Sequence, residues 1–252
     1  MVNRVLCFSN SEWLRLGESS LAPGLEFLDC IDGLWCFDSA QCGKSVLFEG
    51  AHGTMLDLDW GTYPYVTSSS PTSGAVASGA GIGPKHVGRV IGAAKAYTTR
   101  VGAGPFPTEV GEEVAARMRE PGGEFGTTTG RARRIGWFDA VVVRKTARIN
   151  GMDGLAITHL DVLGQFAEIP VCVAYECDGE RTTHFPNDLG RLARCRPVYE
   201  TLPGWQSDIA GARSFADLPV NAQRYVRRIE ELVEVPISHV LVGRQRDQSI
   251  LL

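Results

Sequence analysis

Residues 45–53 read SVLFEGAHG, a short apolar run that leads directly into a glycine-rich turn. A short apolar run ahead of glycine is typical of a buried strand. Three later stretches share this character and contain β-branched residues, namely GLAIT at 154–158, VCVAY at 171–175 and ISHVLV at 237–242. Together these stretches predict the strands of a buried sheet.

Helical spacing marks three further stretches. In HVGRVIGAAKAYTT (86–99) and VNAQRYVRRIEELV (220–233), apolar residues recur three and four positions apart. DAVVVRKTARI (139–149) opens with Asp139, a residue type that caps helices. Strands that alternate with helices predict an α/β fold with a largely parallel central sheet and flanking helices.

Composition limits the kind of protein. The chain has 252 residues, is 44% hydrophobic and 21% charged, and carries a net charge of −4. A negative net charge argues against nucleic acid or an anionic membrane as the partner. No apolar run approaches the ~20 residues that span a bilayer, and the N-terminus does not read as a signal peptide. We therefore expect a cytoplasmic protein.

The cysteines are odd in number and form no CxxC pair. The seven are Cys7, Cys30, Cys36, Cys42, Cys172, Cys177 and Cys195. Zinc sites in proteins usually contain ligand pairs two to four residues apart, so we expect no metal site. Reduced thiols are expected in a cytosolic protein.

Two segments allow more than one interpretation. Residues 1–42 are rich in cysteine, show no sustained period and are left unassigned, although SEWLRLGESS (11–20) is compatible with a short helix. In residues 67–84, fourteen of eighteen positions are Gly, Ser, Thr or Ala. Such a composition predicts either a flexible linker or an ordered loop whose backbone approaches an anion.

Two loops and one carboxylate are candidates for ligand binding. TRVGAGPFPTE (99–109) reads as a rigid connection. EFGTTTGRARR (124–134) combines hydroxyls with arginines, which favours a small anionic ligand over a solvated basic patch or a nucleic-acid contact. Asp161 follows a predicted strand. It either caps the next segment or accepts hydrogen bonds from the N1–H and 2-amino groups of a guanine.

Five islands, in this order, resemble the adenylosuccinate synthetase family. They are FEGAHGTMLDLDWGTYPYVTSS, KAYTTRVGAGPFPTE, EFGTTTGRARRIGW, ITHLDVL and YETLPGW. The resemblance covers residues 43–252, which we assign to the C-terminal portion of that family's domain. It implies a P-loop-NTPase-like synthetase fold that is incomplete at its N-terminus.

The resemblance implies a GTP-dependent carbon–nitrogen ligase that makes adenylosuccinate from IMP and L-aspartate with Mg²⁺. In the family, the catalytic Asp and His and the phosphate-binding lysine belong to an N-terminal GDEGKGK-type loop and the segment after it. Residues 1–252 contain no such loop, and AQCGKS (40–45) precedes a strand where a phosphate loop would follow one. We therefore expect no catalytic residue and no Mg²⁺ ligand in this chain.

The resemblance also implies binding residues, position by position. His52, Thr67 and Arg131 correspond to IMP contacts. Aspartate contacts correspond to Val101, Thr127, Thr128, Thr129, Gly130 and Arg131. GTP contacts correspond to Arg133, His159, Leu160, Asp161 and Gly243. His52 replaces a glutamine and His159 a lysine, and the residues around Gly243 depart from the family's Ser-Thr-Gly-Pro pattern.

Three hypotheses for the chain follow. It is a truncated or fragmentary synthetase, a catalytically inactive module that retains nucleotide binding or regulates, or one half of a split enzyme. The family is typically a homodimer in which one subunit sends an arginine into the other's IMP site. That arginine also belongs to the family's N-terminal region.

Overall fold

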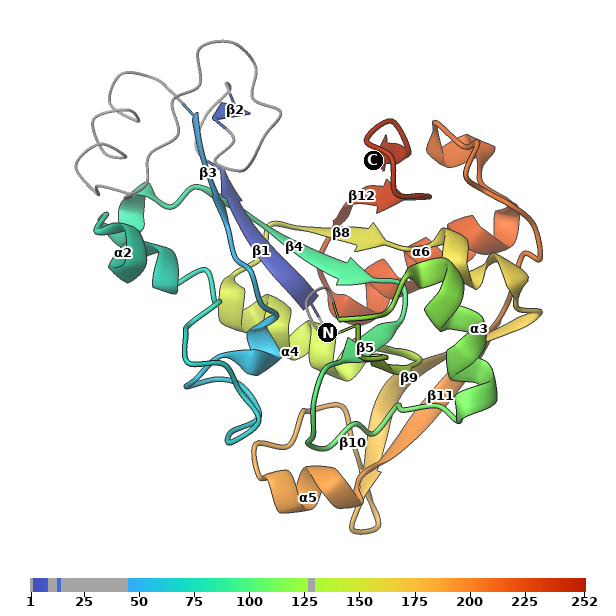
Figure 1. Ribbon diagram of the computed structural model, residues 1–252, viewed down its shortest axis with the longest axis horizontal. Coiled ribbons are helices and arrows are strands. Elements are labelled where there is room, and N and C mark those ends of the chain that lie inside the picture. Colours follow the sequence, from blue (N-terminus) through green and yellow to red (C-terminus); the bar gives the residue numbers. More distant parts are fainter. Residues whose placement is uncertain (1, 9–12, 15–44, 127–129) are drawn as a thin grey trace.

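The structure is a computed structural model that describes residues 2–8, 13–14, 45–126 and 130–252. Its centre is a seven-stranded sheet in the order β13-β12-β8-β4-β1-β3-β2 (Figure 1). The strands are β1 (Val2–Phe8), β2 (Trp13–Leu14), β3 (Ser45–Glu49), β4 (Arg89–Lys95), β8 (Gly154–Thr158), β12 (Ile237–Leu241) and β13 (Ser249–Leu251). The strands predicted at 45–49, 154–158 and 237–242 are confirmed.

Parallel pairing places four strand ends at one edge of this sheet. β4 pairs parallel with β8, and β8 pairs parallel with β12. β1 lies between β3 and β4 and is antiparallel to both, so β3 runs in the same direction as β4. The carboxyl ends of β3, β4, β8 and β12 therefore share an edge, as the predicted α/β class requires.

The segment left unassigned, residues 1–42, contributes backbone to this sheet. β1 occupies a position inside it, and β2 pairs with β3. Trp13 and Leu14 are therefore extended, so the short helix suggested for 11–20 is wrong at these two positions. The other residues of that stretch, together with Gly43 and Lys44 of the GKS sequence, lie outside the described residues.

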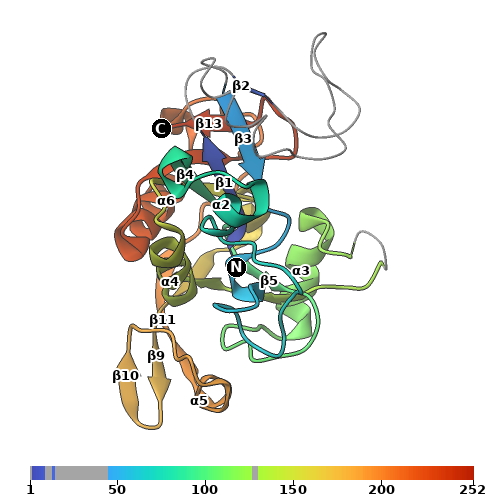
Figure 2. The ribbon, with the colours of Figure 1, turned by 90° about the vertical axis from the view of Figure 1, so that its left-hand side faces the viewer.

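A second, four-stranded sheet lies beside the first. It contains β7 (Phe138–Asp139), β9 (Glu168–Cys177), β10 (Glu180–Thr182) and β11 (Arg196–Pro203). β9 includes the predicted strand at 171–175. A two-stranded sheet pairs β5 (Thr98–Arg100) with β6 (Arg134–Gly136). The β9–β10 hairpin and helix α5 (Leu189–Arg194) extend away from the seven-stranded sheet (Figure 2).

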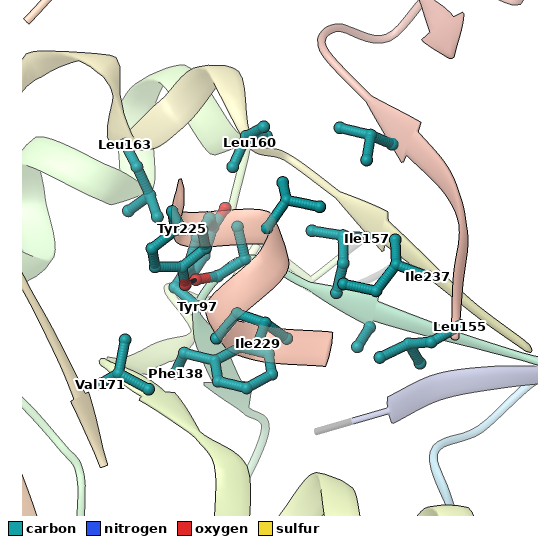
Figure 3. Packing of buried hydrophobic residues seen from close by; sticks show 14 of the residues in the cluster. Tyr97, Phe138, Leu155, Ile157, Leu160, Leu163, Val171, Tyr225, Ile229 and Ile237 are labelled. Atoms are coloured by element: carbon teal, nitrogen blue, oxygen red, sulfur yellow. Dashed lines mark hydrogen bonds between the residues drawn. The ribbon is translucent and has the colours of Figure 1, made fainter. Parts of the chain in front are cut away.

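Helices α4 and α6 cover the sheets and bury the main core. The remaining helical elements are α2 (Ala75–Ala80), α3 (Glu112–Gly122), α4 (Ala140–Asn150), α6 (Val220–Val233), and the short turns η1 (Thr54–Leu56), η2 (Pro84–His86), η3 (Asp161–Gln165) and η4 (Phe215–Asp217). Tyr225 and Ile229 of α6 are fully buried against Tyr97, Phe138 and neighbouring strand residues (Figure 3). The predicted helices at 139–149 and 220–233 are confirmed.

The predicted helix at 86–99 is wrong, because this stretch forms η2, β4 and β5. β4 is buried on both faces, so its apolar residues do not alternate as in a half-exposed strand. Gly92 is required for close packing, because a Cβ built there would lie 2.3 Å from the sulfur of Met152. A doubly buried strand and a buried helix have the same apolar pattern.

Residues 67–84 are ordered and contain helix α2. Ser73 ties the segment to the end of α4, because its backbone N–H donates to Asn150 Oδ1 and its hydroxyl donates to the Asn150 carbonyl, each over 2.8 Å. The flexible-linker interpretation is therefore wrong for this segment.

Asp139 caps α4 and is almost fully buried. Its Oδ1 accepts from the backbone N–H groups of Val141 and Val142, and its Oδ2 accepts from the Tyr175 hydroxyl over 2.5 Å. Burial raises the pKa of the Asp139 carboxyl to about 6. The native state therefore holds a proton that the unfolded chain releases near pH 4.

We expect this carboxyl to lower the free energy of unfolding as the pH rises from 4 to 6, by roughly 3 kcal/mol in total. Asp139→Asn keeps the acceptor for α4 but removes the titration. The difference in unfolding free energy between wild type and variant should therefore shift toward the variant over this window, measured by urea unfolding at several pH values. Asp188→Asn, at the exposed N-cap of α5, is the control. A difference that does not change with pH would contradict the expectation.

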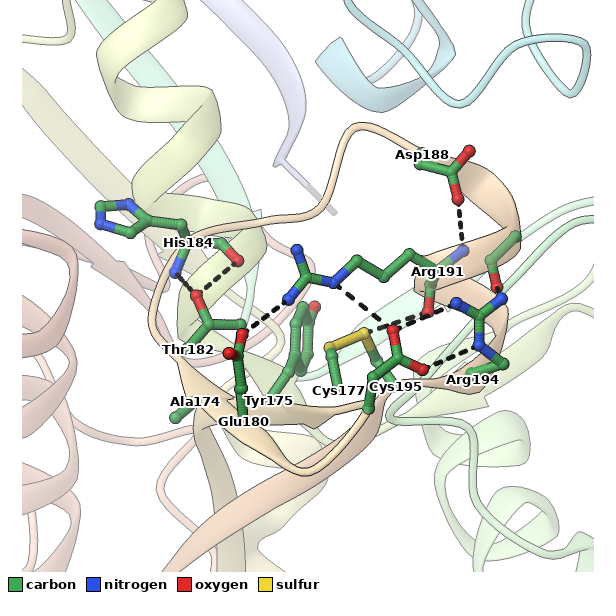
Figure 4. The surroundings of a disulfide bond; sticks show 12 residues. Ala174, Tyr175, Cys177, Glu180, Thr182, His184, Asp188, Arg191, Arg194 and Cys195 are labelled. Atoms are coloured by element: carbon green, nitrogen blue, oxygen red, sulfur yellow. Dashed lines mark hydrogen bonds and ion pairs between the residues drawn. A yellow bond between two sulfur atoms is a disulfide. The ribbon is translucent and has the colours of Figure 1, made fainter.

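Cys177 and Cys195 form a disulfide, so the expectation of reduced thiols is wrong for this pair (Figure 4). Cys177 ends β9 and Cys195 precedes β11, and these antiparallel strands bring their Cα atoms to 4.4 Å. Sequence separation concealed this proximity. Cys172, in the same apolar cluster, is a buried free thiol.

Reduction of this disulfide should destabilise the chain by about 3 kcal/mol, because the bond closes a loop of roughly this size in the unfolded state. Denaturant unfolding with and without reductant measures the change, and Cys195→Ser should abolish the sensitivity to reductant. Cys172→Ser should retain it. Identical midpoints for oxidised and reduced wild type would show that the cross-link does not contribute.

Candidate functional site

A cavity of about 670 Å³ lies at the shared carboxyl edge of the parallel strands. Each of those strands contributes to its wall. The lining residues are Ala51, His52, Gly53 and Leu56 after β3, Ala93, Lys95, Thr99, Arg100 and Val101 around β4 and β5, Thr158, His159 and Asp161 after β8, Leu241, Gly243 and Arg244 after β12, and Arg133.

The order of the strands gives the cavity two ends. His52 follows β3, whereas Asp161 and Gly243 follow β8 and β12. Four inter-strand steps separate β12 from β3, which corresponds to roughly 19 Å at the usual strand spacing. The cavity is therefore elongated along the sheet edge, with Lys95 of β4 between its ends.

A buried carboxylate organises the middle of the cavity. Glu124 has no exposed surface, and both of its oxygens lie 2.7 Å from Lys95 Nζ. Tyr97 donates its hydroxyl to Oε1 over 2.6 Å, and Arg133 donates Nη1 to Oε2 over 2.8 Å. Thr99 accepts a further hydrogen bond from Lys95. These contacts fix two cationic side chains in the cavity wall.

Glu124 stays ionised in this network. Burial alone raises the pKa of its carboxyl, but the charge of Lys95 and the hydrogen bonds from Lys95, Tyr97 and Arg133 outweigh burial, and the net pKa is lowered. Sequence reasoning assigned no role to Lys95 or Glu124. The available signals were a lysine at the end of an apolar strand and an acid at the start of an arginine-rich loop.

The end of the cavity near β8 carries one carboxylate and one imidazole. His159 adopts a left-handed backbone with φ of 58° and packs edge-on to Tyr97, with 6.0 Å between the ring centroids. Burial, with Lys95 nearby, lowers the pKa of the His159 imidazole, so the ring is neutral at pH 7. The Asp161 carboxylate begins η3 without a capping hydrogen bond. The capping interpretation of Asp161 is therefore wrong.

The structure gathers six of the predicted binding residues in the cavity wall, namely His52, Val101, Arg133, His159, Asp161 and Gly243. Four others are described but do not line it. Thr67 is half-buried and donates its backbone N–H to the Leu56 carbonyl, Leu160 is fully buried in the core, and Gly130 and Arg131 lie on an exposed loop. Residues 127–129 lie outside the described residues.

The side chains of the cavity favour an anionic ligand. Lys95, Arg100, Arg133 and Arg244 line it together with a single carboxylate, Asp161. Within the described part of the chain, no three His, Cys, Asp or Glu side chains form a group that could hold a metal ion. Hard divalent cations such as Mg²⁺ bind through oxygen ligands. The described wall therefore does not fit Mg²⁺.

These features define an α/β protein with an elongated cationic cavity at the carboxyl edge of its parallel strands. A profile of the family described as adenylosuccinate synthetase matches residues 30–250. The chain belongs to the adenylosuccinate synthetase family. The match includes residues 30–42, which sequence reasoning left unassigned.

Two similar curated proteins are both adenylosuccinate synthetases. The protein of Synechococcus sp. (strain RCC307) is 56% identical over 224 residues, which are 89% of this chain and 51% of that protein. That of Thermosynechococcus vestitus is 57% identical over 222 residues, which are 88% of this chain and 50% of that protein. This chain thus spans about half the length of these relatives.

Solved structures give the same result. The fully ligated adenylosuccinate synthetase of Plasmodium falciparum matches with a TM-score of 0.85 and 41% identity, over 87% of this chain and 53% of that one. Succinoaminodeoxyadenylate synthetase of cyanophage S-2L, at 18% identity and a TM-score of 0.53, shares the fold. Among the described residues, no helix is both long and apolar enough to span a membrane.

Proposed function

We propose that this chain supplies the guanine-nucleotide and aspartate contacts of an adenylosuccinate synthetase. The reaction converts IMP, L-aspartate and GTP to adenylosuccinate, GDP and phosphate. The supporting observation is the cavity at the carboxyl edge of the sheet, which brings His52, Val101, Arg133, His159, Asp161 and Gly243 to one place from distant parts of the sequence.

In this proposal the β8 end of the cavity holds the guanine. The Asp161 carboxylate accepts from N1–H and the 2-amino group, and the neutral His159 ring stacks on the base. Gly243 lies beside the base, and Leu160 anchors the turn between His159 and Asp161 through its buried side chain. Arg133, which Glu124 holds at 2.8 Å, directs its charge at the nucleotide.

The remaining assignments concern aspartate and IMP. Val101 and the loop with Thr127, Thr128, Thr129, Gly130 and Arg131 receive aspartate. His52, Thr67 and Arg131 serve IMP. The β3 end, where His52 lies, is therefore the IMP end of the cavity.

The proposed chemistry has two steps. A base removes the N1 proton of IMP while O6 attacks the γ-phosphate, and the amine of aspartate then displaces phosphate from C6. Residues 1–252 contain no GDEGKGK-type loop to provide that base, so this chain's part is to bind and orient. Mg²⁺ would neutralise phosphate charge when bound, and its ligands belong to the family's N-terminal region. We further propose a homodimer in the cytoplasm.

Nucleotide binding to residues 1–252 tests the proposal. GTP should bind at least tenfold more tightly than ATP, because adenine lacks the two donors that Asp161 requires and each lost contact costs ~1–3 kcal/mol. Isothermal titration with both nucleotides measures the ratio. Equal affinities, or tighter binding of ATP, would refute the guanine assignment.

A further inference from the structure

The loop at residues 101–104 is held by two guanidinium groups that bind three consecutive carbonyls. Arg134 Nη1 donates to the carbonyls of Gly102 and Gly104 over 3.2 and 2.9 Å. Arg100 Nε donates to the carbonyl between them, that of Ala103, over 2.9 Å. All three carbonyls are therefore directed toward the arginines.

This arrangement directs backbone N–H groups the opposite way. In a planar trans peptide, the N–H of one residue points away from the carbonyl of the residue before it. The N–H groups of Ala103 and Gly104 thus face away from the arginines, and neither donates to an acceptor among the described residues. Gly102 and Gly104 adopt φ of +80° and +108°. Successive N–H groups in such a turn form a concavity that binds anions.

Arg100 adds an uncompensated charge beneath this loop. It is only 3% exposed and lines the cavity. Its Nη2 donates to the Thr62 hydroxyl over 3.1 Å, and within the described residues it has no carboxylate partner. Burial, with Arg134 nearby, lowers its pKa. A buried cation without a counter-ion is costly, so the loop is prepared for an anion.

We propose that Arg100 and Arg134 are positioning residues that shape the 101–104 loop into a carboxylate site, where the N–H groups of Ala103 and Gly104 bind one carboxylate of L-aspartate. The inference rests on the proposed function for the identity of the ligand. Two adjacent N–H donors match the two oxygens of a carboxylate. The charge of Arg100 compensates the bound anion from below.

The amide resonances of Gly102, Ala103 and Gly104 in the ¹⁵N-labelled chain report this binding directly. L-aspartate should shift them, and Arg100→Lys and Arg134→Lys should each raise the half-saturating concentration about tenfold, because a lysine cannot reproduce the guanidinium fork. The control is Arg144→Lys, which removes a guanidinium contact to the Leu232 carbonyl away from the cavity and should titrate like wild type. Inorganic phosphate should shift the same resonances only at higher concentration.

Gly104→Ala tests the loop without removing charge. A Cβ there would lie 2.4 Å from Arg100 Nη2 and 2.9 Å from the Tyr65 ring, at a φ that favours glycine. This variant should lose the aspartate response while GTP still shifts the Gly243 resonance, which shows that the cavity is folded. The inference is overturned if aspartate leaves the wild-type resonances unmoved, if the lysine variants titrate like wild type, or if phosphate binds as well as aspartate. A wild type that responds to aspartate but not to GTP would refute the proposed function alone.

Discussion

Addition of the N-terminal half of a relative, such as that of Synechococcus, is expected to give residues 1–252 adenylosuccinate-forming activity. The chain alone should show no turnover, because the family's catalytic Asp and His are absent from its sequence. Proton transfer by a positioned side chain contributes ~10²–10⁴-fold. We therefore expect the mixed halves to exceed the chain alone by at least ~10³-fold, measured from the absorbance of the product with IMP, GTP, L-aspartate and Mg²⁺.

The association of the halves is measured separately by size exclusion. Halves that stay apart and show no turnover would count against a split enzyme and favour an inactive nucleotide-binding module. Turnover near ~1 s⁻¹ by the chain alone, within the usual range for enzymes, would contradict the expected inactivity. The N-terminal half without its partner is the matched control.

Asp161→Asn is expected to exchange GTP for XTP as the preferred nucleotide of the complemented enzyme. Xanthine carries a carbonyl where guanine carries the 2-amino group, and this carbonyl would face the carboxylate as acceptor against acceptor. The asparagine amide donates to that carbonyl, while its oxygen still accepts from N1–H. A mismatched buried contact costs ~1–3 kcal/mol, so the ratio of kcat/KM values should change by roughly ten- to a hundredfold.

Two comparisons make this experiment specific. Asp59→Asn changes an exposed aspartate outside the cavity wall and should leave the ratio unchanged. Asp161→Ala removes the carboxylate without supplying a new donor, so it should weaken GTP use without improving XTP use. An equal loss for both nucleotides in Asp161→Asn would refute the guanine-reading role.

The sequence predicted those elements whose local signals agree with their burial. Helix α4 begins with a capping aspartate, and α6 has one apolar face, so both were found. β4 was misread because it is buried on both faces and leaves no alternation. β1 was missed because it lies in a cysteine-rich segment without a period, and its place depends on pairing with β3 and β4.

The candidate site was predictable only where family motifs carried it. His159 and Asp161 follow a strand, and a motif marks them. Lys95 and Glu124 carry no shared local pattern and lie 29 positions apart, yet their side chains meet at 2.7 Å. Only the three-dimensional structure shows that one buried acid fixes the cations of the cavity. The same holds for Cys177 and Cys195, which join through two antiparallel strands.

The direction of β1 decides how the chain can be labelled or immobilised. Val2 lies beside Ala94, near the edge where the cavity opens, whereas Leu252 donates its backbone N–H to Ser238 near the start of β12. A fluorophore or affinity tag attached before Val2 would therefore emerge at the ligand-binding edge and compete with nucleotide for space. The same group attached after Leu252 would leave from the opposite edge, so surface-coupled binding measurements should use that end of the chain.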